Sequence, residues 1–233
     1  MDLASELASQ GASSGTTVLA GYQTAGRGRA DRTWATAPGS AILMSFLAHT
    51  QRRQRDLGPL SLLLGLAVSR TVDDCTGARS TIKWPNDVLV EGRKIAGILV
   101  VSKVLHHRED LCLIAGIGLN VNDDRTQLPV MATSIAIVAA SHQSFDDVLT
   151  TLLGNLTTIL ECFEAGDIGA LWQDVGLRLA FRNEAVRIED GARMYLGRLH
   201  GVTDCGLLEL ELASGGIITV AAGDLARGPV TIA

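Results

Sequence analysis

The spacing of apolar residues changes near residue 182, and this change divides the chain into two parts. Before it, long segments carry apolar residues at the spacing of a helix, most clearly between 146 and 163. After it, the segments are short and alternate in polarity; they cover 185–188, 195–202, 207–212 and 217–220. We therefore expect a first domain over 1–181 and a small all-β domain of SH3-like barrel size over 182–233.

The first part mixes helices and strands. Apolar spacing predicts helices over 2–10, 60–74, 146–163 and 172–179. β-branched and apolar runs predict strands over 16–22, 41–48, 81–83, 88–90, 94–101 and 111–118. We expect the strand at 16–22 to be buried and a tight turn at Glu91-Gly92 to join two of the others.

The overall charge argues against a broad nucleic-acid-binding surface. Twenty-five acidic and 20 basic residues give a formal net charge of −5, which disfavours extensive phosphate contacts. Basic residues are nevertheless concentrated in one place, because Arg27, Arg29 and Arg32 lie within six residues of each other with Asp31 as their only acidic neighbour. This local excess of positive charge indicates a small anionic ligand.

The cysteines and the apolar segments indicate the cellular compartment. Cys75, Cys112, Cys162 and Cys205 form no C-x-x-C pair and have no histidine at ligand spacing, so we expect reduced thiols and no zinc site. The first residues lack the basic and apolar parts of a secretory signal, and no apolar run reaches the ~18 residues of a membrane span. We expect a cytoplasmic protein that does not enter a membrane.

The segment Gly26–Arg32, with the sequence GRGRADR, alternates glycines with arginines at its start. Glycines allow a ligand to approach the backbone closely, and guanidinium groups can fork onto phosphate or carboxylate oxygens. A solvated turn whose charges keep it soluble explains the same residues. The sequence contains no G-x-x-x-x-G-K-[ST] motif, so a P-loop nucleotide site is excluded.

A second polar group, Lys83-Trp84-Pro85-Asn86-Asp87, falls at the corner between two expected strands, where functional side chains often collect. The alternative is a hairpin corner in which Asn86 and Asp87 cap their own backbone. Lys94 begins the next expected strand beside small residues that leave room for a ligand, although a solvated strand end is the more ordinary interpretation of a single lysine.

A third group ends the expected strand at 111–118. Gly116, Gly118 and Asn120 suit a close backbone approach and amide hydrogen bonds to a purine edge, but a bulge followed by a turn asparagine explains them equally well. His106 and His107 lie in polar surroundings without a partner at useful spacing, and we expect them at the surface.

The order and spacing of these motifs resemble the biotin protein ligase (biotin–acetyl-CoA-carboxylase ligase) family. The likeness extends from about residue 2 to the carboxyl terminus. It rests on Tyr22-Gln23-Thr24-Ala25-Gly26-Arg27-Gly28-Arg29-x-x-Arg32-x-Trp34, Lys83-Trp84-Pro85-Asn86-Asp87-Val88, Lys94-Ile95-Ala96-Gly97-Ile98-Leu99 and Gly116-Ile117-Gly118-Leu119-Asn120-Val121. It implies an α+β fold in which a mixed or antiparallel sheet with helices, of the class II synthetase type, precedes a small SH3-like C-terminal β-barrel.

The resemblance also implies a reaction in two steps. Biotin and ATP, with Mg²⁺, give biotinyl-5′-AMP and pyrophosphate, and a lysine of a biotin carboxyl carrier protein then attacks the adenylate. Such chemistry requires local cations in a negatively charged chain, because positioned positive charge stabilises phosphoryl transfer. Two alternatives are a catalytically weak or inactive biotin- or adenylate-binding relative and a lipoate-type acyl-protein ligase or transferase. The expected protein is a monomer or a homodimer.

Residue roles follow from the same resemblance. The residues expected to bind biotin are Gln23, Gly26, Arg27, Gly28, Arg29, Lys94, Gly116 and Gly118. Those expected to bind ATP or the adenylate are Arg27, Arg29, Arg32, Trp34, Lys83, Asn86 and Asn120. Arg29, Lys94 and Asp87 are the candidate catalytic residues, with Asp87 aligning or deprotonating the incoming lysine. Mg²⁺ is expected to bind through the phosphates, with Asp87 as the candidate protein ligand.

Two features depart from the family's usual pattern. A strand and a Ser/Thr-Thr-Asn segment that binds the ureido ring usually precede the first helix, and this sequence begins at Met1-Asp2, so either the true start lies upstream of Met1 or one wall of the biotin pocket is missing. In the second case, each unpaired buried polar atom of biotin would cost about 1–3 kcal/mol. Asp31 stands where glycine is usual and adds a negative charge near the phosphates. The winged helix-turn-helix domain of the repressor members has no place here, so we expect a monofunctional protein that does not bind DNA.

Overall fold

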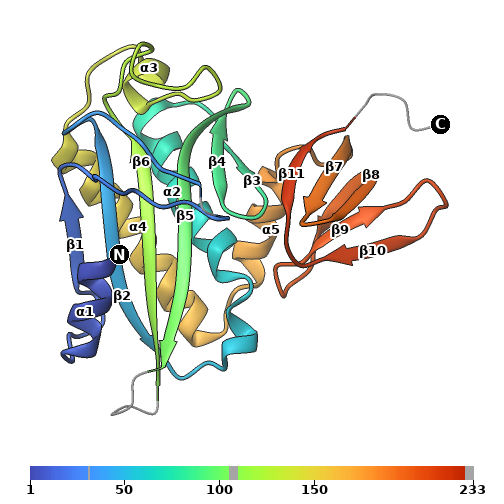
Figure 1. The fold of residues 1–233 in the computed structure, drawn as a ribbon, viewed down its shortest axis with the longest axis horizontal. Helices are drawn as coiled ribbons and strands as arrows, with labels where there is room; N and C mark the ends of the chain where they lie inside the picture. Colours follow the sequence, from blue (N-terminus) through green and yellow to red (C-terminus); the bar gives the residue numbers. More distant parts are fainter. Residues whose placement is uncertain (31, 105–109, 229–233) are drawn as a thin grey trace.

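A computed structural model describes residues 1–30, 32–104 and 110–228. A larger sheet with helices behind it forms the first part of the chain, and a smaller sheet lies to one side (Figure 1). The predictions for Asp31, His106 and His107 lie outside the described residues. No helix among those described is both long and apolar enough to cross a bilayer.

Six strands of the described chain form the larger sheet, and every neighbouring pair is antiparallel. Their order across the sheet is β1-β2-β6-β5-β4-β3. The expected Glu91-Gly92 turn is present between β4 and β5, with both residues at positive φ, 50° and 75°. The strands are β1 (Thr17–Ala20), β2 (Ala41–Thr50), β3 (Thr81–Lys83), β4 (Asp87–Val90), β5 (Arg93–Val104) and β6 (Leu111–Asn120).

Helices cover one face of this sheet. They are α2 (Leu60–Thr76), α4 (Phe145–Ala165) and α5 (Gly169–Arg178), and Figure 1 shows them behind the strands. The helix α2 lies between the sheet and α4 and buries residues around most of its circumference, as its apolar sequence predicts. The helix α4 is capped at its start by Ser144, whose side chain accepts a hydrogen bond from the backbone of Asp147, and at its end by Gly166 in the left-handed conformation.

The opposite face carries α1 (Asp2–Ser9) and is otherwise free of helices among the described residues. Because side chains alternate along a strand, β6 directs Leu113, Ile117 and Leu119 into the main core under the helices. Its other face packs Cys112 and Ile114 against α1 in a smaller core. The sheet thus has a helix-covered face and a more open one.

The strand β1 corrects one prediction, because the run at 16–22 was expected to be buried. It is an edge strand, paired among the described strands with β2 alone, and Leu19 is 52% exposed. A β-branched composition predicts an extended strand, but it does not predict whether that strand lies at the edge or in the middle of the sheet. Three short elements were also missed: the 3₁₀ helix η1 (Gln54–Leu57), α3 (Ile135–Ala139) and β11 (Asp224–Arg227).

The smaller sheet has five antiparallel strands in the order β10-β9-β8-β7-β11 within the part of the chain that is described. This agrees with the expected SH3-like module. The indole Nε1 of Trp84 donates to the carbonyl of Gly206 at 3.0 Å, and that of Trp172 donates to Asp204 O at 3.1 Å. The strands are β7 (Ala185–Asp190), β8 (Arg193–Val202), β9 (Leu208–Glu211), β10 (Ile217–Val220) and β11.

A charged network fixes α5 to α2. Arg178 at the end of α5 donates to Asp174 at 2.9 Å and to Asp73 of α2 at 2.5 Å. The other carboxylate oxygen of Asp73 accepts from the backbone and hydroxyl of Ser80 just before β3, each at 2.7 Å. Arg70 of α2 donates twice to Asp174. Burial alone would raise the pKa of Asp174, but hydrogen bonds from Arg178 and Arg70 outweigh it and hold the pKa below the ordinary value.

Replacing Arg178 with alanine is expected to lower the free energy of unfolding by about 2–4 kcal/mol at pH 7, because two poorly exposed carboxylates lose their shared cation. The folded-state pKa of Asp174 is depressed, so its contribution is complete above 3.8, its ordinary value, and is lost as the pH falls through the lower folded-state value. The difference in the free energy of unfolding between wild type and Arg178→Ala should therefore shrink below pH 3.8. Urea unfolding at several pH values measures it.

The matched control is Arg187→Ala, which removes a half-exposed ion pair to Glu189 on the smaller sheet. An exposed pair of this kind contributes about 0–1 kcal/mol, so this variant should unfold almost as the wild type does. Equal losses of stability in the two variants would contradict the assigned role of Arg178.

Candidate active site

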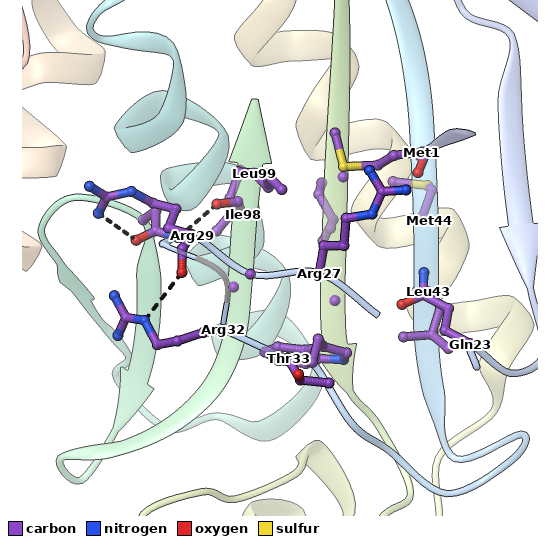
Figure 2. Close-up of a pocket in the computed structure, with 18 of the residues that line it drawn as sticks. Met1, Gln23, Arg27, Arg29, Arg32, Thr33, Leu43, Met44, Ile98 and Leu99 are labelled. Carbon is purple, nitrogen blue, oxygen red and sulfur yellow. Dashed lines mark hydrogen bonds between the residues drawn. The ribbon is translucent and has the colours of Figure 1, made fainter. Parts of the chain in front are cut away.

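A cavity of about 510 Å³ opens on the face of the larger sheet that the helices leave free. Its floor is formed by β2, β5 and β6, and its walls by the segment from 22 to 34, the start of α1, the 83–87 corner and β11. Figure 2 shows the Gly/Arg segment crossing in front of these strands. A cavity of this size is typical of small-molecule sites.

The Gly/Arg segment folds back on itself as a narrow hairpin. The backbone N–H of Trp34 donates to Gly26 O at 3.0 Å, and that of Gly28 donates to Arg32 O at 2.6 Å. A Cβ at Gly26 would lie 2.2 Å from Trp34 O, so this position requires glycine. The side chain of Arg27 extends toward Met1, whereas those of Arg29 and Arg32 point to the other end of the cavity (Figure 2).

Charged side chains of both signs line the cavity. Among the residues that the structure describes, the cations lining the cavity are Arg27, Arg29, Arg32, Lys83 and Lys94, and the carboxylates are Asp2, Asp87 and Asp224. Each carboxylate forms an ion pair: Asp87 with Lys94 at 2.7 Å, Asp2 with Arg27, and Asp224 with Arg32.

Two of these cations, Arg29 and Lys83, form no ion pair with a described carboxylate. Arg29 has a long hydrogen bond of 3.4 Å to the amide oxygen of Asn86. Burial lowers the pKa of Arg29, with Asp224 opposing the shift, and burial likewise lowers the pKa of Lys83 against the effect of Asp87. Partly buried positive charge that no described carboxylate contacts directly is unfavourable, and a bound anion would relieve it.

Asn86 joins the 83–87 corner to β5. Its Nδ2 donates to Ile98 O at 2.8 Å, and its own carbonyl accepts from Ile98 N at 2.9 Å. The Asp87 carboxylate is paired with Lys94. The alternative in which Asn86 and Asp87 only cap their own backbone is therefore wrong, because their side chains reach across to β5.

Lys94 is held from several sides. Its backbone donates to Met131 O at 2.8 Å and accepts from Thr133 N at 2.9 Å, and its Nζ lies 5.4 Å from the centre of the Trp34 ring. Together with the ion pair to Asp87, these contacts orient the ammonium group into the cavity. The Lys94 side chain is 37% exposed yet paired with Asp87, so its surroundings favour a role in the cavity over a plain solvated strand end.

Glycines on the floor make room for large side chains. A Cβ at Gly118 would lie 2.5 Å from the Trp34 indole, and one at Gly116 would lie 2.9 Å from the sulfur of Met1. The space above both glycines is thus shared with protein side chains. The indole Nε1 of Trp34 is buried without an acceptor among the described residues, so it can donate to a ligand.

Asn120 lies at the end of β6 and is only 3% exposed. Its Nδ2 donates to Thr133 O at 2.9 Å, while its Oδ1 is buried without a partner among the described residues. Neither Asn120 nor Gly26 is among the residues that line the cavity. The predicted contact between Asn120 and adenine stays a prediction.

The structure brings most of the predicted site residues together. Those lining the cavity are Gln23, Arg27, Gly28, Arg29, Arg32, Trp34, Lys83, Asn86, Asp87, Lys94, Gly116 and Gly118. Sequence reasoning missed the residues contributed by the start of the chain with α1, by β1 and by β11, which are Met1, Asp2, Leu3, Val18, Leu19, Ala20, Asp224 and Leu225. The helical spacing at 2–10 predicts α1 but does not indicate that its first residues reach the cavity. Among the described residues, no three histidine, cysteine or acidic side chains gather as metal ligands do.

Comparisons with known proteins agree with this geometry. The sequence is 34% identical to the bifunctional ligase/repressor BirA of Bacillus spizizenii over 224 residues, and the match covers 91% of this chain and 66% of that protein, just under two-thirds of its length. It is 31% identical to the biotin–[acetyl-CoA-carboxylase] ligase of Mycobacterium tuberculosis, with 96% of this chain and 83% of that one covered.

The fold is similar to that of the biotin protein ligase of Aquifex aeolicus in complex with biotin and ATP. The TM-score is 0.83 and the sequence identity 26%, with 97% of this chain and 94% of the other covered. The sequence model of the biotin/lipoate A/B protein ligase family matches residues 2–120, just over half of the chain. The chain therefore belongs to the biotin/lipoate A/B protein ligase family.

Proposed function

We propose that this protein is an ATP-dependent biotin–protein ligase. In the first step the biotin carboxylate attacks the α-phosphorus of ATP, which forms biotinyl-5′-AMP and releases pyrophosphate. In the second step the amine of a carrier lysine attacks the activated carbonyl, which forms an amide and releases AMP. The observation that carries the proposal is the pair of cations, Arg29 and Lys83, that have no carboxylate partner in the described cavity.

This charge distribution suits the proposed substrates. Biotin brings a carboxylate and ATP brings a polyphosphate, and the two anions repel each other until cations separate their charges. Arg29 and Lys83 are available for this role without breaking an ion pair, whereas Arg27, Arg32 and Lys94 must first exchange a carboxylate for the ligand. The family relationship and the likeness to a ligase bound to biotin and ATP support the same assignment.

The proposed roles of the cavity residues follow from these positions. Lys94 contacts the biotin carboxylate and the α-phosphate, and Arg29 stabilises the charge that develops on that phosphate. Asp87 aligns the carrier lysine or accepts its proton. Around them, biotin is bound by Gln23, Gly26, Arg27, Gly28, Gly116 and Gly118, and the nucleotide by Arg27, Arg32, Trp34, Lys83, Asn86 and Asn120.

Mg²⁺ fits the site as a partner of the phosphates. In the 83–87 corner, Asp87 presents a carboxylate to the cavity. Mg²⁺ commonly binds to one or two carboxylates together with substrate phosphates. When bound, the ion would neutralise charge on the polyphosphate. Its first protein ligand would be Asp87, once the Asp87 carboxylate is released from its contact with Lys94.

The proposed protein substrate is a biotin carboxyl carrier domain of a biotin-dependent carboxylase. Two relatives are named as biotin–[acetyl-CoA-carboxylase] ligases, which supports this partner. The four cysteines form no disulfide, which is consistent with a reaction in the cytoplasm, where ATP is plentiful and thiols stay reduced.

The decisive experiment incubates the protein with biotin, ATP-Mg²⁺ and an apo carrier domain. We expect one molecule of pyrophosphate released and one lysine biotinylated per carrier, measured by a coupled phosphate assay and intact mass. Absence of both products would overturn the ligase assignment. Biotin binding without pyrophosphate release would identify a binding relative, and a label that appears only with lipoate would identify a lipoate-type ligase.

Lys94→Ala is expected to slow adenylation about 100-fold or more, because it removes a positioned positive charge from the developing phosphate charge. Biotin-dependent exchange of pyrophosphate into ATP measures this step alone. The control is Arg93→Ala, in the same strand but outside the cavity lining, which should retain nearly full exchange. Exchange at the wild-type rate in Lys94→Ala would refute the role.

Arg29→Ala is expected to reduce both formation and retention of biotinyl-5′-AMP, because the cavity loses a half-buried guanidinium that contacts no described carboxylate. We expect about a 100-fold slower first step, with a larger share of the adenylate free in solution after gel filtration. Arg53→Ala, an exposed arginine before η1, is the control. Carrier biotinylation at the wild-type rate in Arg29→Ala would contradict the role.

A further inference from the structure

The residue Asp224 is delivered to the cavity by the smaller sheet. It is the first residue of β11, which pairs with β7, and it forms an ion pair with Arg32 of the Gly/Arg hairpin. The two residues are 192 positions apart in the sequence. With Leu225, it is the part of the smaller sheet that lines the cavity.

The position of Asp224 is set by backbone packing. Gly223 precedes it with φ +137°, and a Cβ there would lie 2.7 Å from the Ile188 side chain and 2.8 Å from Glu189 O. The chain can therefore begin β11 only through glycine in close contact with β7. This contact fixes the backbone position from which the Asp224 side chain extends.

The placement of Asp224 is unfavourable within its own sheet. Its cross-strand partner in β7 is Glu189, and like charges directly opposite each other destabilise a strand pair. Arg187, which contacts Glu189 at 3.1 Å, offsets part of this repulsion. A carboxylate at a locally unfavourable position that faces a site of opposite charge indicates a role in that site.

We propose that Asp224 is a positioning residue that acts through Arg32, as an internal counter-ion that occupies this guanidinium until a phosphate-bearing ligand replaces it. The cavity needs anions to balance its cations, and a carboxylate is the protein group that most resembles a phosphate oxygen pair. The Asp224–Arg32 pair is half exposed, at 52% and 57%, and such pairs are weak enough to exchange.

The exchange has two consequences. In the ligand-free protein, Asp224 anchors the hairpin at Arg32 and keeps the arginines near the cavity. When polyphosphate enters, the Asp224 carboxylate opposes it, because it lies among the cations that the ligand contacts; its charge raises the pKa of both Arg29 and Lys83. The smaller sheet thus limits the affinity of the cavity for anions while it orders the hairpin. This inference rests on the proposed function, in which the cavity binds a polyphosphate.

The test compares Asp224→Asn with the wild type, using inorganic pyrophosphate as the probe. We expect Asp224→Asn to bind pyrophosphate about fivefold more tightly at low salt, measured by calorimetry, with the difference shrinking at high salt. We also expect trypsin to cut the ligand-free variant faster after Arg29 or Arg32, with pyrophosphate protecting both proteins equally.

The matched control is Glu211→Gln, an exposed carboxylate on β9 that faces Arg198 away from the cavity lining. It should leave both pyrophosphate affinity and cleavage unchanged. Unchanged or weaker pyrophosphate binding in Asp224→Asn overturns the inference, as does cleavage of its ligand-free hairpin at the wild-type rate. Failure of the wild type itself to bind pyrophosphate would overturn the inference alone, because turnover of biotin and ATP-Mg²⁺ with the apo carrier decides the proposed function separately.

Discussion

The alternation of side chains across the antiparallel sheet is the constraint on which the rest of the structure depends. In β6, alternate residues enter the main core under the helices, and on the other face Gly116 and Gly118 lie on the floor of the cavity. Gly116 and Gly118 occur on the cavity face, where side chains would collide with Met1 and the Trp34 indole. One strand therefore contributes both to stability and to an open surface, and a shift of one residue in register would exchange the two.

The same face concentrates positive charge that the protein balances only in part. Carboxylates from α1, the 83–87 corner and β11 neutralise three of the described cations, and these elements come from the beginning, the middle and the end of the chain. Two more cations, Arg29 and Lys83, pair with no carboxylate among the residues that the structure describes. Since uncompensated charge in a partly buried site is unfavourable, this arrangement favours the binding of anions. The negative net charge of the chain hardly opposes it, because salt at about 0.1 M screens surface charges more than about 10 Å away.

The elements and motifs were largely predictable because their signals are local. Helical spacing indicated α2 and α4, and the motif residues converge because β4, β5 and β6 are consecutive neighbours in one sheet. The burial of β1 was predicted wrongly, since depth depends on which strands pair beside it. The contribution of Asp224 has no local signal: β11 is four residues long, and its place against Arg32 exists only after both sheets have formed. The buried position of Asn120 likewise depends on the segment that carries Thr133.

Attachment of the smaller sheet to the larger one does not rely on the exchangeable ion pair at Asp224. Trp84 is 1% exposed and donates its indole N–H to Gly206 O, so the motif that forms the cavity corner also holds the second sheet. The backbone at Gly206 also lies very close to the backbone at Gly58, since a Cβ at Gly206 would lie 2.7 Å from Gly58 O. Such contacts are lost only by separating the sheets, whereas a half-exposed ion pair can open alone. The smaller sheet can therefore release Arg32 to a ligand and stay in place, with Asp224 ready to pair again when the ligand leaves.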